Sequence, residues 1–317
     1  MKIKFALVVL ALFGAAIALH AQDGSYKHFV GRWDMTLNSA NQKYPSWLEI
    51  TEQNGQLSAQ YVGRWGNARA LPKIEIKGDH IIFVSPKEEE GTKTDLVFDG
   101  VLSGKRMSGT ITGPDGAPWS WVAVPVPASD PHPRNPGDIS NWAMPVQLFN
   151  GNDLCGWHMS GSGPPVWTVV DGLLISPGNG PELITDKKFQ DFKLHVEVWI
   201  NSESNSGIYL RGRYEVQLET DSVAEPPSHH TGGVYGFIAP KPEQPRSPNE
   251  WQSLDITLIG RRVTVVQNGI TVIDNQEIPG ITGGALDSDE SKTGPIYLQG
   301  SEKGHVKFRN IIITTVQ

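Results

Sequence analysis

Acidic and amide side chains alternate with apolar ones in one short segment, Glu215-Val-Gln-Leu-Glu219. Alternate residues of a β-strand share a face, so Glu215, Gln217 and Glu219 point one way and Val216 and Leu218 point the other. The apolar pair can seal a core. The polar row is then either a solvated surface or the floor of a groove, and the polar residues around it favour a groove.

Other polar residues near this row are hard to explain by architecture alone. With Glu215 and Gln217 they form the candidate site, and Tyr209 is expected close by: Asn205, Arg211, Tyr235, Glu250 and Gln299. They fall on different predicted strands, as a groove across a concave sheet requires. A retaining glycosidase needs two carboxyl groups roughly 5–5.5 Å apart. Glu215 and Glu219 stand four residues apart on a strand, about 13 Å, so they do not form such a pair.

The composition and the first residues of the chain indicate its cellular compartment and restrict its possible binding partners. The 317 residues suffice for two domains. Residues 1–21 resemble a secretory signal peptide, with Lys2 and Lys4 before an apolar run. Without these two lysines the chain has 25 basic against 34 acidic residues, a formal charge near −9, which disfavours nucleic acid and anionic membranes. We therefore expect a periplasmic or secreted protein with no nucleic-acid partner and no membrane anchor.

The single cysteine, Cys155, excludes an intrachain disulfide, and export without a disulfide fits a bacterial periplasm. Short alternating runs bounded by Gly, Asn, Asp and Pro recur along the chain, and long helical periodicity is almost absent. This pattern predicts an all-β protein.

The first set of strands covers residues 26–127. Eight short strands, among them Ala68–Lys77, predict a small antiparallel up-and-down barrel. Its opening Gly31-Arg-Trp33 resembles the start of lipocalin-like barrels. Three tryptophans either line a ligand cavity or fill the barrel, and filling is favoured because small barrels are usually packed solid: Trp65, Trp119 and Trp121.

Residues 128–145 hold four prolines and predict a semi-rigid linker. Beyond it, residues 146–317 contain about a dozen predicted strands, enough for two packed sheets. The linker predicts that residues 146–317 fold and act without the barrel.

A series of motifs in this second half resembles the 3-keto-disaccharide hydrolase domain family. The motifs follow in the family's order: Leu148-Phe-Asn-Gly-Asn-Asp-Leu-Cys-Gly-Trp157, Trp167-Thr-Val-Val-Asp-Gly, Asn205-Ser-Gly, Tyr214-Glu-Val-Gln-Leu, Gly233-Val-Tyr-Gly-Phe-Ile-Ala-Pro240, Glu250-Trp251, Gly294-Pro-Ile-Tyr-Leu-Gln299 and Phe308-Arg-Asn-Ile311. The resemblance covers essentially all of 146–317. It implies a concanavalin-like β-sandwich (a jelly roll), shaped like the laminarinase-type glucanases, and a sugar substrate already oxidised to a ketone at C3. A sugar 3-dehydrogenase is then the expected functional partner.

A 3-keto sugar can be cleaved by elimination. The ketone acidifies the C2 hydrogen, a base removes it, and the enolate expels the group at C1, after which water can add. In this scheme Glu215 is the candidate base or acid, and Arg211 the candidate oxyanion partner. The candidate substrate-binding residues are Asn205, Gln217, Tyr235, Glu250 and Gln299.

The sequence departs from the family after Gln299, where relatives carry a histidine and this chain continues Gly-Ser-Glu302. His230, the neighbouring His229 or Glu302 could substitute, and His230 is the candidate catalytic histidine. The sequence requires no cofactor, although a histidine of this pair with Glu215 or Asp221 could bind a divalent cation.

Two rival functions stay open. One is a non-catalytic, lectin-like carbohydrate-binding module, because fold does not settle function. The other is a β-glucan hydrolase of the laminarinase type. Gly207 also has a plain interpretation, a bend in its strand.

Overall fold

The computed structural model describes residues 24–64, 66–128, 136–161, 166–176, 178–219, 225–245, 247–301 and 304–317. The predicted signal segment, part of the linker, Trp65, Asp221 and Glu302 lie outside these residues. The described chain is almost entirely β-structure, with four short helical turns: η1 (Ser25–His28), α1 (Lys87–Glu90), η2 (Pro136–Asp138) and η3 (Pro227–His229). None of the helices in the described ranges has the length and hydropathy that crossing a bilayer takes.

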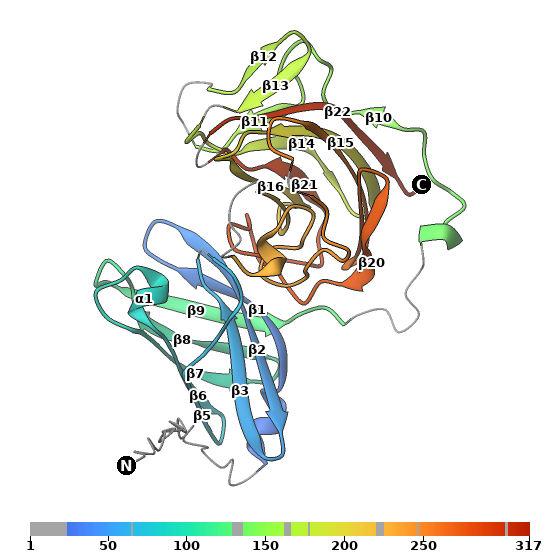
Figure 1. The fold of residues 1–317 in the computed structure, drawn as a ribbon. Coiled ribbons are helices and arrows are strands. Elements are labelled where there is room, and N and C mark those ends of the chain that lie inside the picture. Colours follow the sequence, from blue (N-terminus) through green and yellow to red (C-terminus); the bar gives the residue numbers. More distant parts are fainter. Residues whose placement is uncertain are drawn as a thin grey trace, which may run out of the picture.

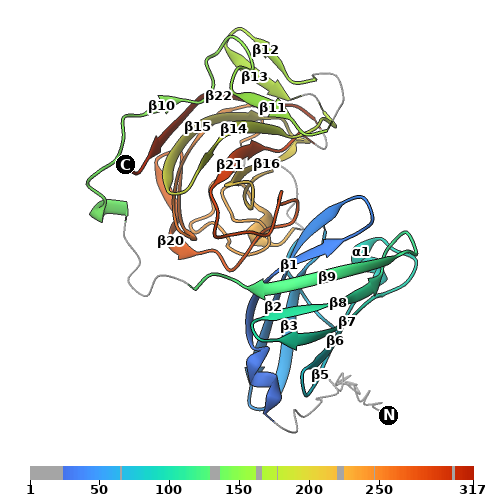
Figure 2. The same cartoon turned by 180° about the vertical axis from the view of Figure 1, so that it is seen from behind.

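The amino-terminal half forms one curled antiparallel sheet (Figure 1). Its strands are β1 (Gly31–Asn38), β2 (Lys43–Gln53), β3 (Gln56–Val62), β4 (Arg69–Ala70), β5 (Lys73–Lys77), β6 (His80–Ser85), β7 (Leu96–Ser103), β8 (Arg106–Thr112) and β9 (Pro118–Pro125). Each strand pairs with the next along the chain, except that β4 does not pair with β5, and β1 pairs with β9. Figure 2 shows the order β9, β8, β7, β6, β5 from behind. The sheet is thus an up-and-down barrel with one open seam.

The open seam lies where one predicted strand is interrupted. The expected strand Ala68–Lys77 is split at Leu71 and Pro72 into β4 and β5, because proline has no N–H to donate to a sheet ladder. Trp119 and Trp121 are buried in the barrel core, so these two fill the barrel as predicted.

The carboxy-terminal half is a β-sandwich of two antiparallel sheets, as predicted. The larger sheet has the order β12 (Thr168–Val170), β13 (Leu173–Ser176), β22 (Val306–Thr315), β15 (Phe192–Ile200), β18 (Trp251–Ile259), β19 (Arg262–Gln267) and β20 (Ile270–Glu277), and β10 (Val146–Gln147) pairs with β22. The smaller sheet has the order β11 (Trp157–Met159), β14 (Leu183–Phe189), β21 (Gly294–Leu298), β16 (Asn205–Leu210) and β17 (Tyr214–Glu219).

The core lies between these two sheets and follows from strand alternation. In β15, Leu194, Val196 and Val198 are buried in it, whereas Lys193 and Glu197 face outward. The smaller sheet contributes its own alternate residues to the same core, and its other face is therefore available for a site.

Candidate active site

A polar cavity of about 240 Å³ lies on the face of the smaller sheet that points away from the sandwich core. Five of the predicted site residues line it: Asn205, Glu215, Gln217, Tyr235 and Gln299. Its other lining residues among those described are Gly66, Asn179, Gly180, Glu182, Tyr209, Gly283, Gly284, Tyr297, Gly300 and Ser301.

Strand alternation places the side chains of β16 and β17 in the cavity. Ile208 of β16 and Val216 of β17 pair with each other and enter the core. Tyr209 pairs with Glu215 on the opposite face, and Gly207 pairs with Gln217. The prediction that Glu215 and Gln217 share a polar groove is in line with this geometry.

Glu215 is the buried acid of the cavity, with 4% of its surface exposed. Its Oε2 lies 2.8 Å from the hydroxyl of Tyr209, and this hydroxyl lies 2.7 Å from the carbonyl oxygen of Gly283. On the other side, the Gln217 amide is satisfied when its nitrogen donates to Oε1 of Glu215, at 3.1 Å, and to the carbonyl oxygen of Ser206, at 3.3 Å. Both carboxyl oxygens of Glu215 are therefore held in place.

Gly207 provides the room for this carboxyl group. A Cβ atom on Gly207 would lie 2.2 Å from Oε1 of Glu215 and 2.7 Å from its Cγ. Gly207 does not have a left-handed φ, so its backbone would accept any residue. The requirement for glycine is therefore steric, and it does not depend on the strand-bend interpretation.

Two tyrosines form the aromatic part of the cavity wall. The rings of Tyr209 and Tyr297 stack with centroids 4.1 Å apart. Burial raises the pKa of the Tyr209 hydroxyl well above its ordinary value of 10.0, and the charge of the nearby Glu215 raises it further whenever that carboxyl group is ionised. Tyr209 is consequently a protonated hydroxyl over the whole working range of pH.

Two further predicted substrate-binding residues, Gln299 and Tyr235, also line the cavity. Oε1 of Gln299 is buried and has no hydrogen-bond partner among the described residues, although a buried acceptor without a partner costs about 1–3 kcal/mol. A ligand hydroxyl would satisfy it. Tyr235 stacks on the ring of His229, with centroids 4.2 Å apart.

Sequence reasoning missed the opposite wall. Glu182 is a second carboxyl group lining the cavity, and its Oε2 accepts a hydrogen bond from Ser160. Asn179 and Ser301 also line this wall. No motif marks these residues, but Glu182 directly precedes β14, the strand that reaches the same sheet edge, and that position is a signal that could have been used.

Three predicted residues lie elsewhere. Arg211 sits in the β16–β17 turn with φ 52° and donates to the hydroxyl of Tyr214 and to the carbonyl of Gly260. His230 faces Glu243, with Nδ1 and Oε1 2.7 Å apart. Glu250 is exposed just before β18, which belongs to the other sheet. The geometry gives none of the three contact with the cavity, so their predicted roles need correction.

The charge of the cavity wall comes from carboxyl groups. Among its described lining residues there is no arginine, lysine or histidine. Within the described ranges, no three His, Cys, Asp or Glu side chains gather closely enough to hold a metal ion. Asp221, one of the proposed cation ligands, and Glu302 lie outside those ranges, so the divalent cation stays a prediction.

Comparison with protein families identifies the carboxy-terminal half. Residues 144–314, more than half of the chain, match the 3-keto-alpha-glucoside-1,2-lyase-like domain. The chain belongs to this family. The matched segment covers the whole sandwich and every cavity residue except Gly66, which the barrel contributes.

Individual relatives of this family member are distant. A 3-keto-disaccharide hydrolase of Bacteroides thetaiotaomicron is 22% identical over 166 aligned positions, which cover 41% of this chain and 57% of the relative. The chain thus spans little more than half of that curated relative. Two crystal structures from Parabacteroides distasonis, named as candidate glycosyl hydrolases, share 31% and 22% identity with TM-scores of 0.46 and 0.45. They cover 53% and 56% of this chain, and 82% and 94% of their own lengths.

Proposed function

We propose that the protein cleaves 3-keto-glycosides by removal of the C2 hydrogen, elimination of the group at C1 and addition of water. The observation that carries the proposal is the buried Glu215 carboxyl group, held by Tyr209 and Gln217 in a cavity of about 240 Å³. Family membership supports the substrate class, since the family is described by 1,2-lyase chemistry on 3-keto-glucosides.

Proton counting at the Tyr209 hydroxyl supports Glu215 as the acid. The Tyr209 hydroxyl has one hydrogen but faces two oxygens, Oε2 of Glu215 and the carbonyl of Gly283. The carbonyl can only accept. When Tyr209 donates to Gly283, its own oxygen can accept from Glu215, provided that Glu215 carries a proton. Glu215 is then the group that protonates the departing glycosidic oxygen.

The second carboxyl group of the cavity, Glu182, is the candidate base. It removes the proton from C2, whose electron pair forms the enolate with the C3 ketone. The enolate then expels the C1 oxygen, which takes the proton of Glu215, leaving an enone with a C1–C2 double bond. Water adds to C1 and a proton returns to C2, so both carboxyl groups regain their starting states without any redox change.

The polar wall suits a sugar. The unpaired Oε1 of Gln299 can accept a hydroxyl hydrogen, and Asn205 and Gln217 present amides on the same face. The aromatic rings at the floor are packed into a stack with 1% and 3% exposure, unlike the exposed aromatic platform expected of a lectin. We also propose that the enzyme is exported and that a sugar 3-dehydrogenase supplies its oxidised substrate.

Isotope exchange tests the elimination. Wild-type protein is incubated with a 3-keto-disaccharide in heavy water, and the product is examined at C2 by NMR or mass spectrometry. We expect deuterium at C2 above the level of a control in which the free keto-sugar is incubated without enzyme. Turnover with the C2 hydrogen fully retained would mean direct displacement at C1.

The parent disaccharide, not oxidised at C3, separates the rivals. Cleavage of the parent at a rate comparable to that of the keto-sugar supports a glucan hydrolase. Binding of both sugars without cleavage of either supports the lectin-like module. Glu182→Gln completes the test, because loss of exchange in that variant identifies the base.

A further inference from the structure

One wall of the cavity comes from the barrel and not from the family domain. Gly66 lies in the loop between β3 and β4, and the segment 278–293 of the sandwich runs past it between β20 and β21. A Cβ atom on Gly283 would lie 2.2 Å from the carbonyl oxygen of Gly66, and one on Gly236 would lie 2.7 Å from Cβ of Asn67. The barrel loop therefore touches two of the sandwich loops that contribute lining residues to the cavity, those of Gly283 and Tyr235.

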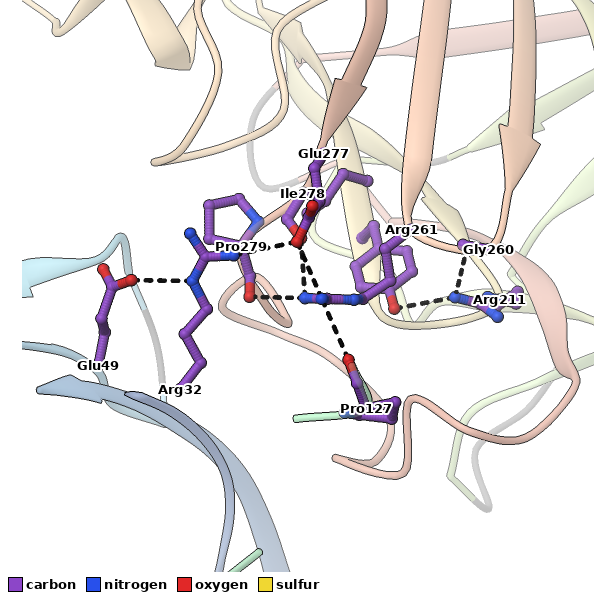
Figure 3. Close-up of polar contacts among 10 residues, drawn as sticks. Arg32, Glu49, Pro127, Arg211, Gly260, Arg261, Glu277, Ile278 and Pro279 are labelled. Atoms are coloured by element: carbon purple, nitrogen blue, oxygen red, sulfur yellow. Dashed lines mark hydrogen bonds and ion pairs between the residues drawn. The ribbon is translucent and has the colours of Figure 1, made fainter. Parts of the chain in front are cut away.

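Charged side chains fix the barrel to the sandwich (Figure 3). Glu277, at the end of β20, accepts from Arg32 of the barrel at 3.1 Å and from Arg261 at 2.9 Å. Arg261 also donates to the carbonyl of Pro127, at 3.2 Å, where the barrel ends. Arg211, predicted as a catalytic group, donates to the carbonyl of Gly260, the residue before Arg261, on the sandwich side of this network (Figure 3).

Two buried carboxyl groups, one from the barrel and one from the sandwich, also meet at the interface. Asp34 of β1 is 4% exposed and Glu290 of the sandwich 3%. Burial, followed by the adjacent charge of Glu290, raises the pKa of Asp34 to about 9, while Arg261 opposes the shift. Asp34 is thus a neutral carboxylic acid at neutral pH.

An apolar cluster supports the same loops. Trp47 of β2 is completely buried and packs edge-to-face on Phe237, with ring centroids 5.3 Å apart. A Cβ atom on Gly280 would lie 2.0 Å from the indole nitrogen of Trp47. Phe237 is two residues from Tyr235, and Gly280 is three residues from Gly283, so the barrel supports two cavity-lining positions from behind.

The loop is also fixed within the barrel. Arg69 at its end pairs with the buried Glu90 and donates to Ser85 at 3.1 Å. Arg64 at its start lies over the rings of Tyr44 and Trp119, 5.4 and 5.9 Å from their centroids. Gly66 is consequently held between two anchored residues.

We propose that the barrel is part of the active site and that Gly66, in the β3–β4 loop, forms the wall against the leaving group of the glycoside. This inference rests on the proposed function for the direction of the leaving group. Gly66 touches Gly283, the Gly283 carbonyl contacts the Tyr209 hydroxyl, and that hydroxyl contacts Glu215. The acid that protonates the departing oxygen therefore stands next to the barrel loop.

The wall sets the size of the substrate. The cavity of about 240 Å³ is below the roughly 300–1,000 Å³ typical of ligand pockets, so it accepts a sugar ring with a small group attached. We infer that the substrates are short glycosides and the ends of chains. This arrangement differs from the independent sandwich that the proline-rich linker predicts.

A matched pair of variants in the full chain tests the wall. Gly66 has φ 79° and a Cβ atom there would meet nothing within 4 Å; Gly55, in the distant β2–β3 turn, has φ 77° and equally open surroundings. Asparagine tolerates this backbone conformation. Gly66→Asn therefore places a side chain at the wall without a clash, and Gly55→Asn is its control.

The assay compares kcat/KM for a methyl 3-keto-glucoside and a 3-keto-disaccharide. We expect Gly66→Asn to lower the value for the disaccharide at least ~10-fold more than for the methyl glycoside, and Gly55→Asn to leave the ratio unchanged. An unchanged ratio in Gly66→Asn would overturn the leaving-group wall, whether both substrates slow by the same factor or neither slows.

Sugar binding provides a readout that is independent of turnover. Calorimetric titration of the parent disaccharide into the same proteins should show weaker binding only in Gly66→Asn. If the wild type binds the sugar but cleaves no keto-glycoside, the proposed function fails while a selective loss of affinity still supports the wall. Equal affinity in all three proteins, or no binding in any, counts against it.

Discussion

A methyl group on Gly207 is expected to displace the carboxyl group of Glu215, the proposed acid. Gly207 lies opposite Gln217 in the sheet and diagonally beside Glu215, and it has no left-handed backbone angle. Gly207→Ala therefore changes only the space available to the carboxyl group. Because the new Cβ atom would meet Oε1, Cγ and Cδ of Glu215, rotation of the carboxyl group alone cannot relieve the contact.

The size of the effect follows from the distances. The contact to Oε1 would be 2.2 Å, whereas ordinary van der Waals contact begins at 3.4 Å, so the carboxyl group must move by 1.2 Å. Misplacement of a catalytic group by about 1 Å can lower a rate 10²-fold, which corresponds to about 2.7 kcal/mol of activation free energy. We expect kcat/KM for a 3-keto-disaccharide to fall by about this factor.

Steady-state kinetics and thermal unfolding check this prediction together. Gly137→Ala is the matched control, because a Cβ atom at Gly137 meets nothing within 4 Å and its φ is not left-handed. A Gly207→Ala protein that remains folded and keeps kcat/KM within about 3-fold of Gly137→Ala would refute the positional role of Glu215.

Three further changes have defined outcomes. Glu215→Gln, nearly isosteric, should lower kcat at least ~10²-fold because it removes the acid, and unaltered turnover would remove Glu215 from the mechanism. A carboxyl group whose pKa rises on folding, from 3.8 to about 9 for Asp34, binds its proton more tightly in the folded protein, so stability falls as pH rises between those values. Asp34→Asn should reduce the slope of the unfolding free energy between pH 5 and 8 by up to about 1.4 kcal/mol per pH unit, measured by urea titration; equal slopes would contradict a protonated Asp34. Gly280→Ala, against Trp47, should lower kcat/KM although no lining residue changes, and activity equal to that of Gly137→Ala would show that the interface does not support the cavity.

Strand alternation was sufficient to predict the floor of the site. The two-residue period of Glu215–Glu219 assigned Val216 and Leu218 to the core, where they lie. It assigned Glu215, Gln217 and Glu219 to the opposite face, and the first two line the cavity, whereas Glu219 is not among its described lining residues. The same period cannot be continued through a turn. Arg211 has a left-handed backbone in the hairpin, so its side chain leaves the face that simple counting assigns to it.

The walls could not be predicted from the sequence because backbone forms much of them. Gly283, Gly284 and Gly300 line the cavity without a side chain to suggest chemistry. Gly66 reaches the cavity only through the packing of two domains, and strand patterns contain no information on that packing. Glu182 has no motif around it, and its position directly before a strand was the one available signal, which solvent-exposed acids share.

The interface also determines when the cavity can form during folding. Thr36 and Ser288, whose hydroxyl oxygens lie 2.7 Å apart across the interface, are 252 positions apart in the chain. Contacts of such separation form late in folding, because a long stretch of chain must be ordered before its ends meet. Each domain has its own hydrophobic core, and domains generally fold as units. We therefore expect the cavity, which needs residues of both domains, to be completed last, when the segment 278–293 packs on the barrel.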